Sequence, residues 1–141
     1  MIRRRQTSLL SALLPAAALT IAGCASGPPP KPEIPASISP DWKLLSFDKA
    51  APPPEIPGAG SPDCWKGAYA GAGSADVWIC GYTVSGNAFD AVQRVPAEAQ
   101  AVKFQQGRYF VLVKWNNVPK AKVGALVRAI EKALAPAGKR Q

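Results

Sequence analysis

The segment Cys64–Thr83 constrains the fold most, because it predicts a β-hairpin with a defined register. Two strand-like runs flank Gly71-Ala72-Gly73, which is typical of a three-residue hairpin turn. If the turn centres on Ala72, then Cys64 faces Cys80 across the hairpin. The next pairs along the strands are Trp65 with Ile79, Lys66 with Trp78, and Gly67 with Val77. Because alternate residues of a strand point to opposite faces, Trp65 and Trp78 are expected on different sides of the sheet.

Two further regions have the alternation of β-strands. Trp42 and Leu44 would lie on one side of a strand at 42–47, with Leu45 and Phe47 on the other, although a single helical turn would look similar. The runs 101–104 and 109–115 flank a turn at 105–108 and predict a second hairpin. Its buried face is expected to carry five apolar residues: Val102, Phe104, Tyr109, Val111 and Val113.

Two helices complete the predicted domain. The first covers about 85–95, with Ser85 or Asn87 as N-cap, an apolar face that includes Phe89, and Pro96 at its end. The second covers 119–134, with Pro119 at its first position. Its apolar residues recur at helical spacing: Val123, Leu126, Val127, Ile130 and Leu134. The order β-β-β-α-β-β-α predicts an α+β fold, a two-layer sandwich with an antiparallel sheet of about five strands and both helices on one face.

Prolines mark the segments without regular structure. Residues 25–41 read ASGPPPKPEIPASISPD, and proline favours an extended polyproline II chain there. We expect this segment to be a tether that holds the domain away from a surface. Residues 51–62 read APPPEIPGAGSP and form a second proline- and glycine-rich loop. That loop is long for a compact domain, so it is either functional or mobile.

The first 24 residues have the pattern of an export signal. Arg3-Arg4-Arg5 precede an apolar run at 9–21, which is shorter than the roughly 20 apolar residues that a membrane-spanning helix needs. The run ends in Ile21-Ala22-Gly23-Cys24, which resembles the lipobox of bacterial lipoproteins. In that family the precursor is acylated on the cysteine and cut just before it. The alternative is ordinary cleavage after Ala16-Ala17-Ala18, which would leave Cys24 as a thiol.

The lipoprotein resemblance implies a division of the chain and a location. Residues 1–23 would be a removed signal peptide, 24–41 a lipidated Cys24 with its tether, 42–135 the α+β domain and 136–141 a basic tail. Several acyl chains such as palmitate give stable anchoring, whereas one gives only marginal binding. Ala25, with no Asp after the cysteine, is similar to lipoproteins of the outer membrane, so the resemblance implies a domain facing the periplasm.

Export also bears on the two remaining cysteines. An oxidising compartment favours a disulfide between the facing residues Cys64 and Cys80. In the chain-entropy model the closed loop contributes about 3 kcal/mol of stability. A catalytic redox pair is the alternative, but the CxxC spacing and helix N-terminus typical of such pairs are missing.

Charge and composition exclude several functions. The net charge of +8 falls to +5 when the three leader arginines are removed, and the remaining bases are scattered. This suits an anionic surface but lacks the clustered footprint of a nucleic-acid binder, so no nucleic-acid partner is predicted. The chain has no histidine, the commonest general base and zinc ligand. Its carboxylates are dispersed, and we predict no catalytic residue, metal site or cofactor.

The aromatic residues of the hairpin suggest a binding face. One of Trp65 and Trp78 is expected in the core, and the other on a helix-free face with Lys66 and Tyr82. Either Lys66 stacks on Trp78 and the aromatics shield an open sheet, or Lys66, Trp78 and Tyr82 form a platform for a sugar chain, peptide or protein.

Beyond the leader, the chain from Cys64 to Leu134 is similar to small exported bacterial domains of unknown function. The similarity is carried by Trp65, Tyr69, Ala88-Phe89 and Gly107-Arg108-Tyr109-Phe110. It implies no active residues. The sequence therefore favours a membrane-anchored, non-enzymatic domain that binds an envelope protein. A glycan- or small-ligand-binding module is the first alternative and an atypical hydrolase the second.

Overall fold

The computed structural model describes residues 27–56 and 60–136. The predicted leader, the lipobox with Cys24 and the basic pair Lys139-Arg140 lie outside these residues.

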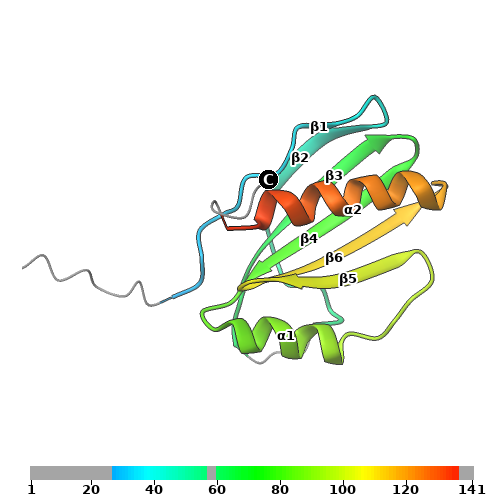
Figure 1. The fold of residues 1–141 in the computed structure, drawn as a ribbon. Coiled ribbons are helices and arrows are strands. Elements are labelled where there is room, and N and C mark those ends of the chain that lie inside the picture. Colours follow the sequence, from blue (N-terminus) through cyan, green and yellow to red (C-terminus); the bar gives the residue numbers. More distant parts are fainter. Residues whose placement is uncertain (1–26, 57–59, 137–141) are drawn as a thin grey trace, which may run out of the picture.

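The described chain forms an antiparallel sheet that curls into a half-barrel, with two helices (Figure 1). The strands are β1 (Ser37–Ile38), β2 (Trp42–Ala50), β3 (Asp63–Gly71), β4 (Ser74–Gly81), β5 (Ala101–Gln106) and β6 (Tyr109–Asn116). The helices are α1 (Ser85–Arg94) and α2 (Lys120–Leu134). The strand order across the sheet is β1-β2-β3-β4-β6-β5. The α+β class is confirmed, but the sheet has six strands rather than five, because β1 forms inside the predicted tether.

The β3–β4 hairpin has the predicted register. Cys64 pairs with Cys80, Trp65 with Ile79, Lys66 with Trp78 and Gly67 with Val77. The turn begins at Gly71, which has a φ of 146°, and a Cβ atom there would collide with the carbonyl oxygen of Asp41. Ala72 donates a backbone hydrogen bond of 2.8 Å to that same oxygen. The turn therefore requires glycine and also fixes the chain that enters β2.

The simple alternation predicted for β2 is wrong. The pairing of β2 with β3 shifts register between Leu44 and Ser46, which indicates a β-bulge at Leu45. The extra residue brings Trp42, Leu44 and Phe47 to the same side, where they pack in one core. Leu45 is left 67% exposed.

The concave face of the sheet holds the larger core, covered by α2. Its buried residues come from β1 to β4, from β6 and from the apolar stripe of α2: Ile38, Trp42, Tyr69, Ala75, Val77, Ile79, Val111, Val113, Leu126, Ile130 and Leu134. The five residues predicted for the buried face of the second hairpin all belong to this core. The Trp42 indole also donates a 3.0 Å hydrogen bond to the Lys122 carbonyl, which ties β2 to the first turn of α2.

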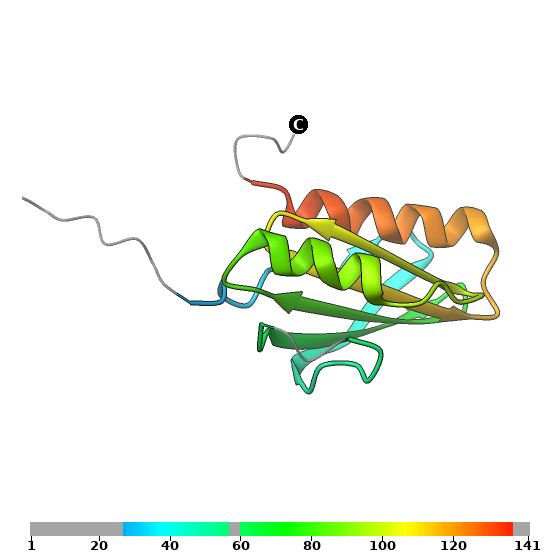
Figure 2. The same ribbon diagram turned by 90° about the horizontal axis from the view of Figure 1, so that it is seen from below.

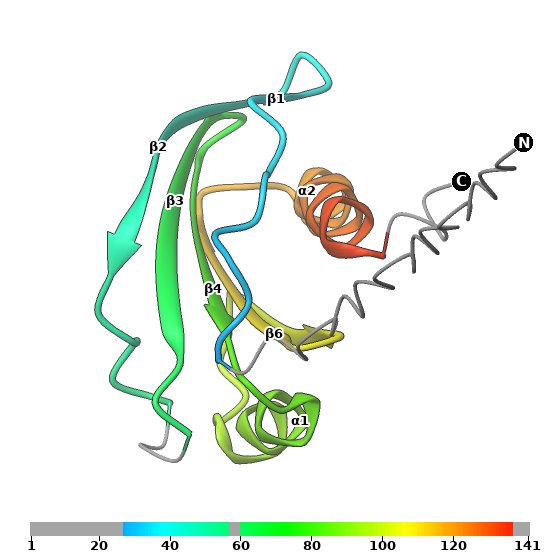
Figure 3. The ribbon, with the colours of Figure 1, turned by 90° about the vertical axis from the view of Figure 1, so that its left-hand side faces the viewer.

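The convex face holds a second core, covered by α1. Ala88, Ala91 and Val95 pack with Cys64, Cys80, Tyr82, Phe110, Leu112 and Ile56. The prediction that both helices share one face is therefore wrong, as Figure 3 also shows. The reason lies in β6, where Phe110, Val111, Leu112 and Val113 are consecutive buried residues, so that each face presents apolar side chains to a helix.

The ends of the helices also differ from expectation. Val84 is the N-cap of α1, in place of Ser85 or Asn87, and its carbonyl accepts a 3.1 Å hydrogen bond from the Asn87 backbone. Phe89 is 55% exposed, because Ala88 and Ala91 form the side of α1 that meets the sheet. Pro119 is the N-cap of α2 rather than its first helical residue.

The described part of the predicted tether is extended but is docked on the domain, not free of it. Figure 3 shows this segment, coloured blue to cyan, across the concave side of the sheet. The hydroxyl of Tyr69 donates a 2.6 Å hydrogen bond to the Pro35 carbonyl, and that of Tyr109 a 2.9 Å bond to the Pro30 carbonyl. Proline lacks an N–H but keeps its carbonyl acceptor, so the prolines of this segment are held by donors from the domain. In the other direction, Lys31 Nζ donates a 2.7 Å bond to the Phe47 carbonyl.

Apolar contacts add to the docking of this segment. Pro29 is buried, and Ile34 packs against the concave core. A Cβ atom added at Gly67 would lie 3.3 Å from Ile34 Cδ1, so Ile34 sits directly above the glycine of β3. The folded unit therefore begins about thirteen residues before the predicted boundary at 42, near Pro29.

Candidate functional site

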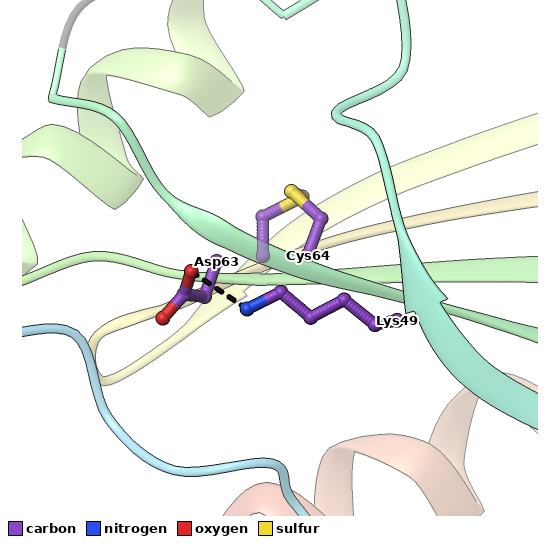
Figure 4. The surroundings of a disulfide bond; sticks show 4 residues. Lys49, Asp63 and Cys64 are labelled. Carbon is purple, nitrogen blue, oxygen red and sulfur yellow. Dashed lines mark hydrogen bonds and ion pairs between the residues drawn. A yellow bond between two sulfur atoms is a disulfide. The ribbon is translucent and has the colours of Figure 1, made fainter.

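The Cys64–Cys80 disulfide joins β3 and β4 near the open end of the hairpin, on the side of α1. Its S–S distance is 2.09 Å, and both residues are buried in the convex core. Figure 4 shows the surroundings of the bond, where Lys49 Nζ forms a 2.9 Å ion pair with Asp63 beside Cys64. The predicted pairing is confirmed. Because burial keeps solvent thiols away from the sulfur atoms, the geometry fits a structural cross-link rather than a redox pair.

The structure brings together only two of the three residues predicted for a binding face. Lys66 Nζ lies 4.8 Å from the centroid of the Trp78 ring, as the stacking interpretation predicts. Tyr82, in contrast, is 1% exposed and packs in the convex core with the disulfide. The face is not free of helices either, because α1 covers part of it and residues 53–56 contribute the buried Pro53 and Ile56.

A charged group next to Trp78 was not predicted from the sequence. Lys114 on β6 lies 5.9 Å from the Trp78 ring centroid and forms ion pairs with Glu55 and, at 3.5 Å, with Glu98. Asp76 on β4 is paired with Lys66 at 3.7 Å. We call Lys66, Asp76, Trp78 and Lys114 the convex patch. It presents an aromatic ring between two cations, with carboxylates at its border.

Lys114 of the convex patch forms an ion pair with Glu55 of the loop at 51–56. The hydrogen bond from Lys114 lowers the pKa of Glu55, and the bond to Glu55 raises the pKa of Lys114. The bond is accepted by Oε1 of Glu55. The other carboxylate oxygen, Oε2, is buried and has no hydrogen-bond partner. The pair fastens the loop at 51–56 to the sheet, so this part of the loop is held in place.

Sequence reasoning missed this pair because its partners are 59 residues apart. The sequence did contain one signal, because Lys114 is a charged residue within an otherwise apolar strand. In the sheet it lies opposite Asp76 of β4.

A groove lies between the docked N-terminal segment and the end of α2. Its volume is about 450 Å³, and it is lined by Pro30, Lys31, Pro32, Glu33, Ile34, Pro35, Tyr109, Ala133 and Leu134. Its walls combine proline rings with one basic and one acidic side chain. Burial raises the pKa of Tyr109, whose hydroxyl is engaged with the Pro30 carbonyl. The groove therefore offers contacts to a ligand that has both apolar and polar groups.

Within residues 27–56 and 60–136, no group of three or more histidine, cysteine or carboxylate side chains could hold a metal ion. The same ranges contain no helix with the length and apolar character needed to cross a bilayer.

Comparison with known proteins gives no relative: no protein-family model, no curated protein and no solved structure matches this chain. The class that can be stated is therefore structural. The protein contains a disulfide-linked α+β half-barrel with one helix on each face of the sheet and a docked proline-rich segment.

Proposed function

We propose that this protein is a lipid-anchored lipoprotein of the bacterial envelope, attached through Cys24 to the outer membrane and facing the periplasm. Its domain binds a partner there and is not an enzyme. The observation that carries the proposal is the buried disulfide between Cys64 and Cys80, because such a cross-link suits the oxidising compartment to which the leader would deliver the chain. The lipobox resemblance of Ile21-Ala22-Gly23-Cys24 supplies the anchor.

The anchor is tested by cell fractionation. The wild-type protein is expected in the membrane fraction, and Cys24→Ser is expected in the soluble fraction. A double variant, Cys64→Ala with Cys80→Ala, is the matched control, because it changes cysteines without touching the lipobox and should stay with the membrane. Membrane association of Cys24→Ser equal to that of wild type would refute the anchor.

The convex patch is the surface that best supports a binding role. Trp78 and the cations on either side of it offer stacking and hydrogen-bond donors on one area of the sheet. Tryptophan is enriched where proteins bind one another, and surface cations attract an acidic partner. We infer that an acidic segment of an envelope protein is the partner. Lys66 is its principal contact, because Lys66 is paired with one carboxylate, at 3.7 Å, whereas Lys114 is paired with two.

Crosslinking in intact envelopes tests this role. A crosslinker placed next to the patch, at Ala68, should give one adduct that disappears in the Trp78→Ala and Lys66→Ala double variant. The control is Lys43→Ala, an exposed lysine of β2 that belongs to no part of the patch. If the adduct survives the double variant, the convex patch is not the binding surface.

A glycan or small ligand is the second candidate, and the same ring favours it. A tryptophan face bordered by charged groups can stack on a sugar and bond its hydroxyls. Soluble cell-wall fragments would then change the tryptophan fluorescence of wild type but not of Trp78→Phe. A titration without any change in wild type would remove this candidate and leave the protein partner.

A further inference from the structure

The docking of the N-terminal segment places one end of the domain close to the proposed anchor. Arg108 Nη1 donates a 3.2 Å hydrogen bond to the Gly27 carbonyl and a 3.4 Å bond to the Thr83 carbonyl. Gly27 follows Cys24 by three residues, and an extended chain covers at most about 3.6 Å per residue. The carbonyl held by Arg108 can therefore lie no more than about 11 Å from the anchored residue.

Several elements meet at the end where Gly27 lies. The backbone N–H of Tyr82 donates a 2.9 Å bond to the Arg108 carbonyl, and the Gln105 side chain donates a 3.0 Å bond to the Ser85 carbonyl. These contacts join the β4–α1 connection to the β5–β6 turn. Figures 1 and 2 show the start of the described chain, in blue, and the end of α2, in red, at the same end. We call residues 27–28, 82–89 and 106–108 the anchored end.

The anchored end carries two of the exposed large hydrophobic side chains of the described residues. Three large hydrophobic residues are exposed in residues 27–56 and 60–136, and two of them, Val84 at 56% and Phe89 at 55%, belong to this end. The third, Leu45, is on the bulge of β2. Arg108 adds a guanidinium with five donors, of which Nη1 makes both bonds named above. Exposed apolar side chains next to a cation suit a membrane interface, where apolar groups enter the boundary of the acyl chains and cations meet anionic headgroups.

We propose that the anchored end rests on the lipid surface, with Val84 and Phe89 in the interface and Arg108 at anionic headgroups. This inference depends on the proposed lipidation of Cys24. The headgroup region of one leaflet is roughly 5–8 Å thick. Residues 24–27 span at most about 11 Å, so Gly27 stays near the outer border of the headgroups. The domain is then held against the membrane in one orientation, and the β3–β4 turn points into the periplasm.

Two labelled variants test this orientation in the lipidated full-length protein. Thr83→Cys places a fluorophore at the anchored end, and Ser74→Cys places one at the other end of β4, which is roughly 25 Å away at 3.3 Å per residue. Both positions are exposed hydroxyl residues. The native pair Cys64 and Cys80 is oxidised and buried, so the label reacts with the new thiol.

The labelled proteins are reconstituted in vesicles of phosphatidylethanolamine and phosphatidylglycerol that contain a headgroup-linked quencher. Quenching at position 83 is expected to be at least fivefold greater than at position 74. Equal quenching of two membrane-bound proteins would overturn the orientation. If neither protein binds the vesicles, the anchor itself has failed, so the two proposals fail in distinguishable ways.

A second comparison tests the two apolar residues directly. Val84→Ser with Phe89→Ser should lower the quenching at position 83 at least twofold, whereas Leu45→Ser should leave it unchanged. All three side chains are exposed, so the substitutions should leave the fold intact, and circular dichroism spectra check this. Unchanged quenching in the double variant would overturn the contact of Val84 and Phe89 with lipid.

Discussion

The two faces of the sheet bury apolar side chains in different ways. The concave face is covered by the continuous stripe of α2 and by the docked proline-rich segment, and its core extends across all six strands of the sheet that the structure describes. The convex face is covered by the short helix α1, whose contact side consists of Ala88 and Ala91, and by the loop at 53–56. The convex core is smaller and contains the disulfide. The difference indicates that a covalent bond and an ion pair supplement the packing where the covering helix is short.

The largest expected effects test whether both faces are true cores. Phe110→Ala on the convex face should lower the free energy of unfolding by about 3–5 kcal/mol, and Leu126→Ala on the concave face by about 2–5 kcal/mol, because both side chains are fully buried. Urea denaturation gives these values. Leu45→Ala, at an exposed position, should change the free energy of unfolding by less than about 0.5 kcal/mol. A loss below 1 kcal/mol for Phe110→Ala would show that the convex face is not a core.

Loss of the disulfide should be the next largest effect. Cys64→Ala with Cys80→Ala should lower the stability by about 3 kcal/mol, since the open chain regains the entropy that the closed loop had lost. When a reductant is added, the urea midpoint of wild type should fall to about that of the double variant. The midpoint of the double variant should not change. Equal midpoints for oxidised and reduced wild type would contradict a stabilising role.

The docked segment makes the concave face sensitive to one hydroxyl group. Tyr69→Phe leaves the Pro35 carbonyl without its donor and should cost about 1–3 kcal/mol. Hydrogen exchange of the non-proline amides at 31–38 should accelerate in this variant more than exchange in α1. Acceleration of equal size in both regions would mean global destabilisation and not release of the segment.

The raised pKa of Tyr69 predicts that the stability of the fold falls at alkaline pH. Burial raises the pKa of Tyr69 above its ordinary value of 10, so the folded protein keeps a proton that the unfolded chain releases. Stability should therefore be full below pH 10 and should fall as the pH rises above 10. Tyr69→Phe should show a shallower fall than wild type between pH 9.5 and 11. Parallel curves would assign the loss to other groups, among them Lys114.

The smallest expected effect is the stability that the Glu55–Lys114 ion pair on the convex face loses at acidic pH. Because Lys114 lowers the pKa of Glu55, the pair contributes stability above the ordinary glutamate pKa of 4.5 and loses it as the pH falls below that value. The pair is partly exposed, with side-chain exposures of 20% and 31%, so its contribution is expected to be under about 1 kcal/mol. Glu55→Gln should reduce the stability at pH 7 and leave it nearly unchanged at pH 3. An equal loss at both values would point to packing of the loop rather than to charge.

Local patterns account for what could be predicted from the sequence. The register of β3 and β4 follows from a short turn with Gly71, and α2 follows from five apolar residues at helical spacing. The pairing of Cys64 with Cys80 follows from that register. All these features depend on residues close together in the chain, where periodicity and turn chemistry are strong signals.

Contacts over long sequence distances account for what could not be predicted. The docked segment depends on bonds from Tyr69 and Tyr109 to carbonyls 34 and 79 residues away, and composition shows only that prolines exclude regular structure. The side of the sheet that α1 covers is decided by β6, which is apolar on both faces. Two residues of the convex patch, Lys66 and Trp78, were predicted to lie side by side, because this follows from the hairpin register. Lys114 was not predicted, because it comes from another strand.

Lipid anchoring is tested most directly by the mass of the mature amino-terminal peptide from membranes. The proposed anchor predicts a chain that begins at Cys24 and carries the added mass of a diacylglyceryl group, with or without a further acyl chain on the amino group. A chain that begins at Met1, or one that begins after Ala18 and has an unmodified thiol at Cys24, would contradict it.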